Sequence, residues 1–181
     1  MNIEDITDRI ATIQSYQTTD VELEIEGSIY QIDFIDKQEF KLAKHVRGLV
    51  KIFNDHPLLI DYNQPSSTAY INSKAADPKQ LAIEIKKAIE IITLNWRSWE
   101  DYITNKNLHY SFADFLQNLT EGNGLLINGP DVIVKAVIAV CEANDIKTTT
   151  FENDISAASY KLLIIDDYYV IAKEFNLETS S

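Results

Sequence analysis

The sequence has few of the residues that crosslink, bend or interrupt a chain. It contains one cysteine, five glycines and four prolines among 181 residues. The single cysteine, Cys141, excludes an intramolecular disulfide, and the scarcity of glycine and proline excludes a collagen-like or linker-rich chain. Apolar residues make up 45% of the chain and charged residues 24%, proportions that indicate a globular domain able to bury its own core.

Long apolar segments and a secretory leader are also missing. The longest apolar run, Val132 to Cys141, is interrupted by Lys135 and falls well short of the roughly 18 residues that a transmembrane helix needs. The first residues, Met1 to Asp5, lack the basic start and the apolar stretch of a signal peptide. We therefore expect a soluble, cytoplasmic protein with no membrane partner.

The spacings that mark common catalytic and metal sites do not occur. The three histidines, His45, His56 and His109, lie far apart, and no pair of cysteines or histidines has metal-ligand spacing. A Gly-x-Ser-x-Gly elbow and a Gly-Lys-Ser/Thr phosphate loop are missing too. Cys141 falls in an apolar segment, which is typical of an inert core thiol. We expect no metal and no cofactor, and the sequence favours a protein that is not an enzyme.

Positive charge is scarce at both ends of the chain. Residues 1–36 contain nine acidic residues and one basic residue, and residues 108–181 contain eleven acidic and four basic residues. The net charge is −12, although residues 37–107 are mildly basic. Phosphate backbones select lysine and arginine, so a nucleic-acid partner is disfavoured. Acidic ends favour a basic protein partner instead.

The apolar spacing predicts an α+β or α/β fold. We expect a mixed sheet of about six to eight short strands packed with about five helices, one of them a long central or interface helix. The chain would form a single compact domain over 1–181, with two packed lobes, 1–105 and 106–181, as the alternative. Helices are predicted over residues 3–16, 36–53, 77–103, 111–121 and 132–143. Strands are predicted over residues 21–25, 30–34, 58–62, 68–72, 125–128, 148–151, 160–165 and 168–173.

The first hairpin carries the most distinctive charge pattern. Its first strand alternates apolar residues with Glu22, Glu24 and Glu26, so one face is buried and the other is acidic and open to water. An acidic strand face can serve solubility alone or attract a cationic partner. Glu22, Glu24 and Glu26 are therefore candidate binding residues.

The predicted helix over 77–103 carries the second group of candidates. Its apolar stripe ends near Trp96 and Trp99, and Ile83, Ile91 and Leu94 lie off that stripe. A helix with a second apolar face is central or lies at an interface, so self-association through this helix is one alternative. Trp96 and Trp99 are candidate binding residues because tryptophans anchor interfaces, although they also fill cores.

Three further segments have a predicted role. The helix over 36–53 would carry a basic stripe, which is either a solvated helix face or a contact for an acidic surface. Residues 125–151 read as strand, helix and strand, which suggests a parallel pair with a crossover. The tail, 176–181, is polar and is expected to fray. The stripe consists of Lys37, Lys41, Lys44, Arg47 and Lys51.

The expected order of helix, hairpin, helix, two strands and long helix over residues 3–103 is similar to that of small acidic type III secretion chaperones. This resemblance implies a protein-binding role. The sequence as a whole predicts a non-enzymatic, acidic protein-binding module of the immunity-protein, antitoxin or chaperone type. The alternatives are an enzyme whose site is assembled from distant loops and a self-associating structural subunit.

Overall fold

The computed structural model describes residues 3–41, 46–104, 110–153 and 158–179. Within these residues the chain forms eleven strands in two antiparallel sheets and five α-helices, so the fold is α+β. The chain divides into two compact units, of which unit 1 is Met1–Leu59 with Ser159–Ser181 and unit 2 is Ile60–Ala158. Unit 2 is thus one continuous segment inserted into unit 1, and its boundaries differ from the lobes 1–105 and 106–181.

Unit 1 contains an eight-stranded sheet and two short 3-10 helices. The strands follow the order β11-β3-β2-β1-β5-β9-β10-β4, and every neighbouring pair is antiparallel. Unit 2 enters the chain between β5 and β9, which pair directly. The elements are η1 (Ile3–Ile6), β1 (Ile10–Tyr16), β2 (Asp20–Ile25), β3 (Ser28–Ile35), β4 (Glu39–Lys41), β5 (Arg47–Phe53), η2 (Pro57–Leu59), β9 (Lys161–Ile165), β10 (Tyr168–Ala172) and β11 (Glu174–Thr179).

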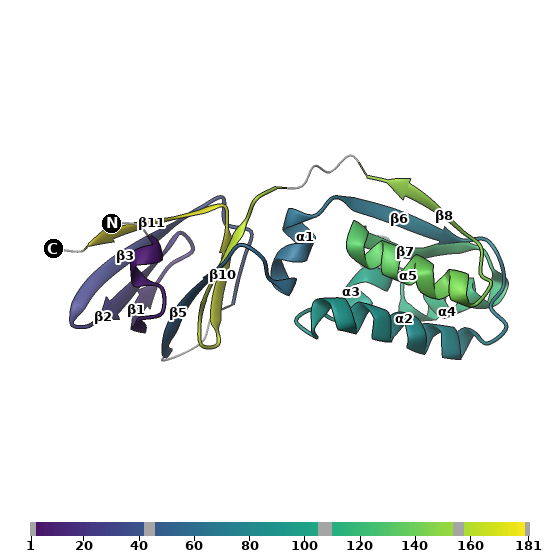
Figure 1. Cartoon of the computed structure of the whole chain (residues 1–181), viewed down its shortest axis with the longest axis horizontal. Coiled ribbons are helices and arrows are strands. Elements are labelled where there is room, and N and C mark those ends of the chain that lie inside the picture. Colours follow the sequence, from purple (N-terminus) through teal and green to yellow (C-terminus); the bar gives the residue numbers. More distant parts are fainter. Residues whose placement is uncertain (1–2, 42–45, 105–109, 154–157, 180–181) are drawn as a thin grey trace. The chain divides into compact units, whose positions relative to one another are not determined.

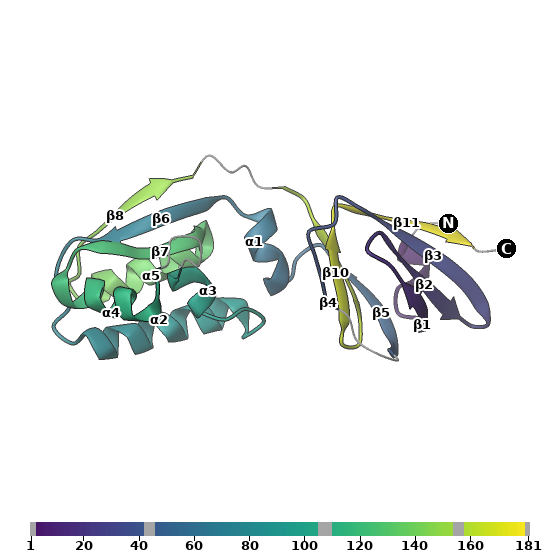
Figure 2. The ribbon, with the colours of Figure 1, turned by 180° about the vertical axis from the view of Figure 1, so that it is seen from behind.

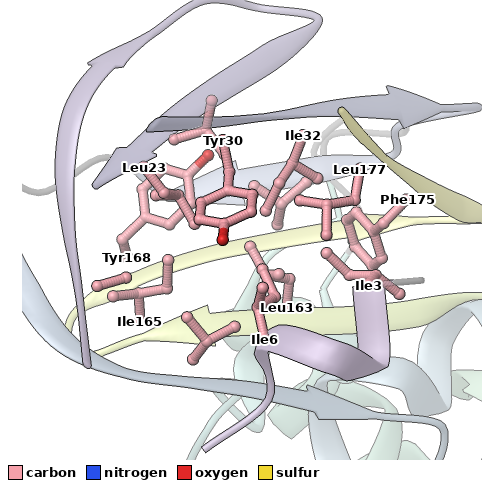
Figure 3. Packing of buried hydrophobic residues seen from close by; sticks show 14 of the residues in the cluster. Ile3, Ile6, Leu23, Tyr30, Ile32, Leu163, Ile165, Tyr168, Phe175 and Leu177 are labelled. Atoms are coloured by element: carbon pink, nitrogen blue, oxygen red, sulfur yellow. The ribbon is translucent and has the colours of Figure 1, made fainter. Parts of the chain in front are cut away.

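The core of unit 1 draws on strands from both halves of this sheet. Leu23 of β2 and Ile32 of β3 share one buried cluster with Leu163 of β9 and Tyr168 of β10. Figure 3 shows these side chains converging from different strands, with Ile6 of η1 beside them. One sheet can bury a shared core only by folding over on itself, which leaves the opposite face of each strand turned outward.

Unit 2 is a two-layer arrangement of one sheet and several helices. Its three strands follow the order β7-β6-β8, and β6 is antiparallel to both neighbours. Figures 1 and 2 show α2, α4 and α5 on the same side of this sheet, where the cluster of Ile71, Ile85, Phe115 and Val134 is buried. The elements are α1 (Ile60–Asn63), β6 (Ser66–Ile71), α2 (Pro78–Thr93), α3 (Glu100–Ile103), α4 (Phe112–Glu121), β7 (Gly124–Pro130), α5 (Asp131–Ala143) and β8 (Thr148–Glu152).

Strong local signals gave correct predictions. The first hairpin turns at Glu26 and Gly27, whose φ angles of 53° and 81° fit a two-residue turn that matches strand twist. Asp77 caps α2 by accepting from the Gln80 amide at 3.0 Å. Ser111 and Asp114 form a capping box at α4. The predicted strands over 68–72, 125–128 and 148–151, the helix over 132–143 and the hairpin over 160–173 are also present.

Two predicted helices of unit 1 are wrong. Residues 3–16 form η1 and β1, and residues 36–53 form β4 and β5 on either side of residues 42–45, which lie outside the described residues. Leu49 is 46% exposed, whereas Val46 and Val50 are buried. Burial thus follows the alternation of a strand, because β5 is held between β1 and β9. The element order that resembled secretion chaperones is therefore not present.

The predicted basic stripe is wrong too, because the helix that would carry it is not present. Lys37 lies 3.9 Å from the centre of the Phe40 ring, and Lys51 pairs with Asp8. Lys41 ends β4 and Arg47 begins β5, while Lys44 lies outside the described residues. These cations therefore share no helix face.

The prediction of one long helix over 77–103 is wrong as well. α2 ends at Thr93 because Leu94 and Asn95 take φ angles of 48° and 61°, and the left-handed conformation ends a helix. The short helix α3 follows as a separate element. Residues 58–62, predicted as a strand, form η2 and the start of α1. Among the described residues, no helix has the length and apolar character needed to span a membrane.

The C-terminal predictions need two corrections. β7 and β8 are not paired, because β6 lies between them and bonds to both. The tail does not fray over its described part: residues 174–179 form β11, which pairs along β3 from Glu174 opposite Ile35 to Thr179 opposite Tyr30. Leu177 is buried in the unit 1 core, so burial of alternate apolar side chains holds this strand.

Candidate functional site

One outward face of unit 1 gathers acidic side chains from three adjacent strands. On β2, Val21, Leu23 and Ile25 are buried, so the intervening residues point outward. β3 and β11 alternate in the same way. We call the outward carboxylates of these strands the acidic face. They are Asp20, Glu22 and Glu24 of β2, Asp33 of β3, and Glu174 and Glu178 of β11.

The strand register brings these carboxylates into rows. Asp20 is paired with Asp33, and Glu22 is paired with Gln31. Gln31 is also paired with Glu178 on its other side, so β11, β3 and β2 present Glu178, Gln31 and Glu22 in one row. β2, β3 and β11 contain no lysine or arginine. The three strands therefore build one negatively charged surface.

Neutral donors provide the hydrogen bonds that fix several of these carboxylates. Gln14 donates to Glu24 at 2.6 Å, and Gln31 donates to Asp33 at 2.9 Å. The Thr19 hydroxyl donates to Asp20 at 3.0 Å. Such contacts orient a carboxylate without cancelling its charge. Several side chains of the face are thus held by hydrogen bonds, and the face remains strongly negative.

Glu26 differs from Glu22 and Glu24. It occupies the hairpin turn, and its carboxylate lies 3.4 Å from the Arg9 guanidinium. The turn borders a hollow of ≈ 590 Å³ in which Arg9 and Arg47 stand among acidic groups. Glu22 and Glu24 lie on β2 and belong to the acidic face, and Glu24 also lines this hollow. Glu26 lies in the turn, outside the acidic face, on a surface of mixed charge.

The two candidate tryptophans lie in different surroundings. Trp96 follows the left-handed residues that end α2 and is 48% exposed. Trp99 comes just before α3 and packs edge-on against Phe112 at 5.5 Å and Phe115 at 6.2 Å between ring centres. Trp99 lines an apolar groove on unit 2. The structure does not place the two rings on one helix face, because the helix that would align them ends at Thr93.

One cluster of titratable groups in unit 2 joins three segments of the chain. The Tyr102 hydroxyl donates to Asp61 at 3.0 Å, and Arg97 contacts the same carboxylate at 3.1 Å. Burial is the main cause that raises the pKa of Tyr102, so this phenol remains a proton donor. The three residues join α1, α3 and the segment after α2.

Cys141 and His56 lie in surroundings that disfavour their charged forms. Burial raises the pKa of Cys141 to about 12, which makes this thiol a poor nucleophile. Burial also lowers the pKa of His56, whose Nδ1 accepts from the Leu58 amide at 3.2 Å. In the part of the chain that the structure describes, no cluster of three or more histidine, cysteine or acidic side chains could hold a metal ion.

Four members of the acidic face were missed at the sequence level: Asp20, Asp33, Glu174 and Glu178. Asp20 directly precedes the first predicted hairpin strand and Asp33 lies within the second, but pairing across strands is needed to bring them together. Residues 174–178 alternate acidic or polar with apolar side chains, which is a strand pattern. That alternation was the available signal, and its short length made the segment look like a polar tail.

Comparison of the chain with protein-family models, with curated proteins and with solved structures gives no match. The function is therefore argued from the acidic face and the groove themselves.

Proposed function

We propose that this protein is a non-enzymatic protein-binding module that engages a basic partner protein through the acidic face. The observation that carries the proposal is the gathering of six carboxylates on β2, β3 and β11, three strands that contain no basic residue. An immunity protein, an antitoxin or a chaperone is the kind of protein that works in this way. The proposal includes a cytoplasmic location for the module and its partner.

Electrostatics favours a functional surface over a merely solubilising one. Solubility requires only that charge be dispersed, whereas this face places Asp20 directly across from Asp33. Like charges opposite each other in a sheet destabilise it. A concentrated negative potential, by contrast, attracts a cationic partner from a distance and orients it on approach. The repulsion lowers the stability of the sheet locally, while the same charges make association with a cationic partner faster and more selective.

The partner's chemistry follows from the same face. Its carboxylates are spread over three adjacent strands, so they match lysine and arginine side chains on a folded surface. Nucleic acid would be repelled, because its phosphates carry the same sign of charge. Binding should weaken steeply with salt, since the carboxylates are exposed or half-buried and are screened within about 10 Å at 0.1 M ionic strength.

Affinity capture from lysate of the native host tests the proposal. Three forms of the full chain would be immobilised: the wild type, a face variant with Glu22→Gln, Glu24→Gln and Glu178→Gln, and a control variant. The control carries Glu121→Gln, Glu142→Gln and Glu152→Gln on unit 2, so both variants lose the same number of charges. We expect the wild type and the control, but not the face variant, to retain a stoichiometric basic protein at low salt.

The captured protein would then be produced and its association rate measured. The rate with the wild type should fall as salt rises, and the face variant should associate about tenfold more slowly at low salt. Equal capture by all three forms, or association that neither salt nor the face substitutions alter, would contradict the proposal. Capture of no basic protein by the wild type would contradict it as well.

A further inference from the structure

Unit 2 carries an apolar groove that the acidic face does not explain. The groove lies between α2 and α4 and has a volume of ≈ 310 Å³. α2 contributes Ala82 and Ile83, α4 contributes Phe112 and Leu116, and Trp99 completes the apolar part of the lining. Ile83 is 47% exposed and Phe112 is 39% exposed, so large apolar surface remains in contact with water. Such surface is costly to leave uncovered.

An aromatic cluster gives the groove a preformed wall. Trp99 meets Phe112 edge-on at 5.5 Å, and Phe112 stacks near Phe115 at 6.1 Å between ring centres. Phe115 is fully buried in the unit 2 core. Packing on the buried Phe115 ring thus holds the wall in place, and the groove is formed before any ligand binds. A preformed apolar site loses little conformational entropy when it binds.

The charged residues that line the groove are both cationic. Lys79 and Lys86 of α2 contribute their aliphatic stems to an apolar lining, and lysine stems of this kind leave the ammonium groups at the margin. Lys86 lies 3.7 Å from Glu90 on the same helix, an exposed pair that contributes little. The two ammonium groups give the groove a positively charged edge, which is unusual on a chain with a net charge of −12. A positively charged edge favours an anionic ligand.

We infer that this groove binds a small hydrophobic carboxylate of the medium-chain fatty acid class. The volume of ≈ 310 Å³ lies at the lower end of the range for small-molecule binding pockets. The apolar lining suits an alkyl chain and offers no hydrogen bonds to a sugar or a nucleobase. The alkyl chain lies against Trp99 and Phe112, and the carboxylate faces Lys79 and Lys86.

The two tryptophans of the chain allow a direct measurement. Trp99 lines the groove, whereas Trp96 is not among its lining residues. In the Trp96→Phe variant, the remaining indole emission reports on the groove. This variant of the full chain would be titrated with decanoate below its critical micelle concentration. Decyltrimethylammonium, which has an alkyl chain one carbon longer and the opposite charge, is the comparison probe. We expect a saturable change with decanoate and a much weaker response to the cation.

Charge substitutions in the Trp96→Phe background test the margin of the groove. Lys79→Glu with Lys86→Glu should weaken decanoate binding by about tenfold or more. The control, Lys87→Glu with Lys147→Glu, makes the same change in net charge at exposed residues outside the groove lining and should leave decanoate affinity unchanged. Circular dichroism and thermal unfolding would establish that each variant is folded. Ile83→Asn should weaken both probes, because it makes the lining polar.

Three results would overturn the inference. They are a tryptophan signal that does not saturate with decanoate, equal affinity for the two probes, and equal losses in the groove and control charge variants. The acidic face contributes no residue to the groove, so the face variant with Glu22→Gln, Glu24→Gln and Glu178→Gln should bind decanoate like the wild type. Failure of this inference therefore leaves the proposed protein-binding function untouched, and the reverse also holds.

Discussion

Asp20 on β2 lies directly opposite Asp33 on β3. Two carboxylates in one cross-strand row repel each other, and the third residue of the row, Asn176 of β11, brings no positive charge. Each carboxylate is fixed by a neutral neighbour, Thr19 for Asp20 and Gln31 for Asp33. The arrangement therefore retains repulsion at a position where a single substitution would relieve it.

Asp33→Asn should stabilise the protein and weaken its proposed binding. The amide oxygen of asparagine can still accept from Gln31, while the repulsion with Asp20 disappears. We expect the free energy of unfolding to rise by about 0.2–1 kcal/mol at low ionic strength, with a smaller gain at high salt because screening already reduces the repulsion. Urea unfolding at two salt concentrations measures this. Glu152→Gln on β8 is the control, and a gain that is absent or independent of salt contradicts the prediction.

Glu26→Asn should stabilise the first hairpin. Glu26 holds a φ of 53° ahead of Gly27, and asparagine adopts this left-handed conformation more readily than glutamate does. The change removes the contact with Arg9, whose side chain is 45% exposed while that of Glu26 is 74% exposed, so little is lost. We expect the midpoint of urea unfolding to rise slightly. Because Glu26 lies outside the acidic face, association with a basic partner should change far less than in the face variant.

Glycine-to-alanine substitutions at two left-handed positions should differ greatly. Gly27 has a φ of +81° with no atom within 4 Å of an added Cβ, whereas at Gly122, with a φ of +74°, the Cβ would lie 2.3 Å from the Lys74 amide nitrogen. Gly27→Ala should cost about 1–2 kcal/mol in conformational energy alone. Gly122→Ala adds a backbone clash, so its loss in thermal stability should be several times larger. Similar melting temperatures for the two variants would show that the clash is relieved.

Cys141 should make stability fall at alkaline pH. Burial raises the pKa of this thiol from 9.0 to about 12, so between these values the unfolded chain releases a proton that the folded chain keeps. The free energy of unfolding then falls with pH by up to about 1.4 kcal/mol per pH unit from this group. In Cys141→Ala this contribution is missing, and the other titrating groups cancel in the comparison. Urea unfolding from pH 8 to 10.5 should show the wild type losing its advantage over the variant.

The errors in unit 1 arise from one ambiguity. Ile3, Ile6, Ile10 and Ile13 match a helical period, yet Ile10 is 55% exposed on β1 while Ala11 is fully buried. Isoleucine favours strands as readily as it lines helices. The pairing of β1 with both β2 and β5 decides between the two, and a single sequence gives no view of that pairing.

Residues whose roles depend only on near neighbours were predictable. Asp77 and Ser111 cap helices, and Gly27 closes a hairpin, because each acts on backbone groups within a few positions along the chain. Glu22 and Glu24 face water because their strand alternates, and that too is local.

Long-range pairing decided the rest. The sequence alone determined the acidity of the chain, its helix caps, the first hairpin and the C-terminal hairpin. The tertiary structure alone decided that β11 joins β3 and so adds Glu174 and Glu178 to Asp33, Glu22 and Glu24. It also decided that Trp99, separated from α2 by residues 94–98, lines a groove with α4. A surface built from distant segments depends on which strands and helices pack together, and that choice is made by burial of the whole core rather than by any one segment.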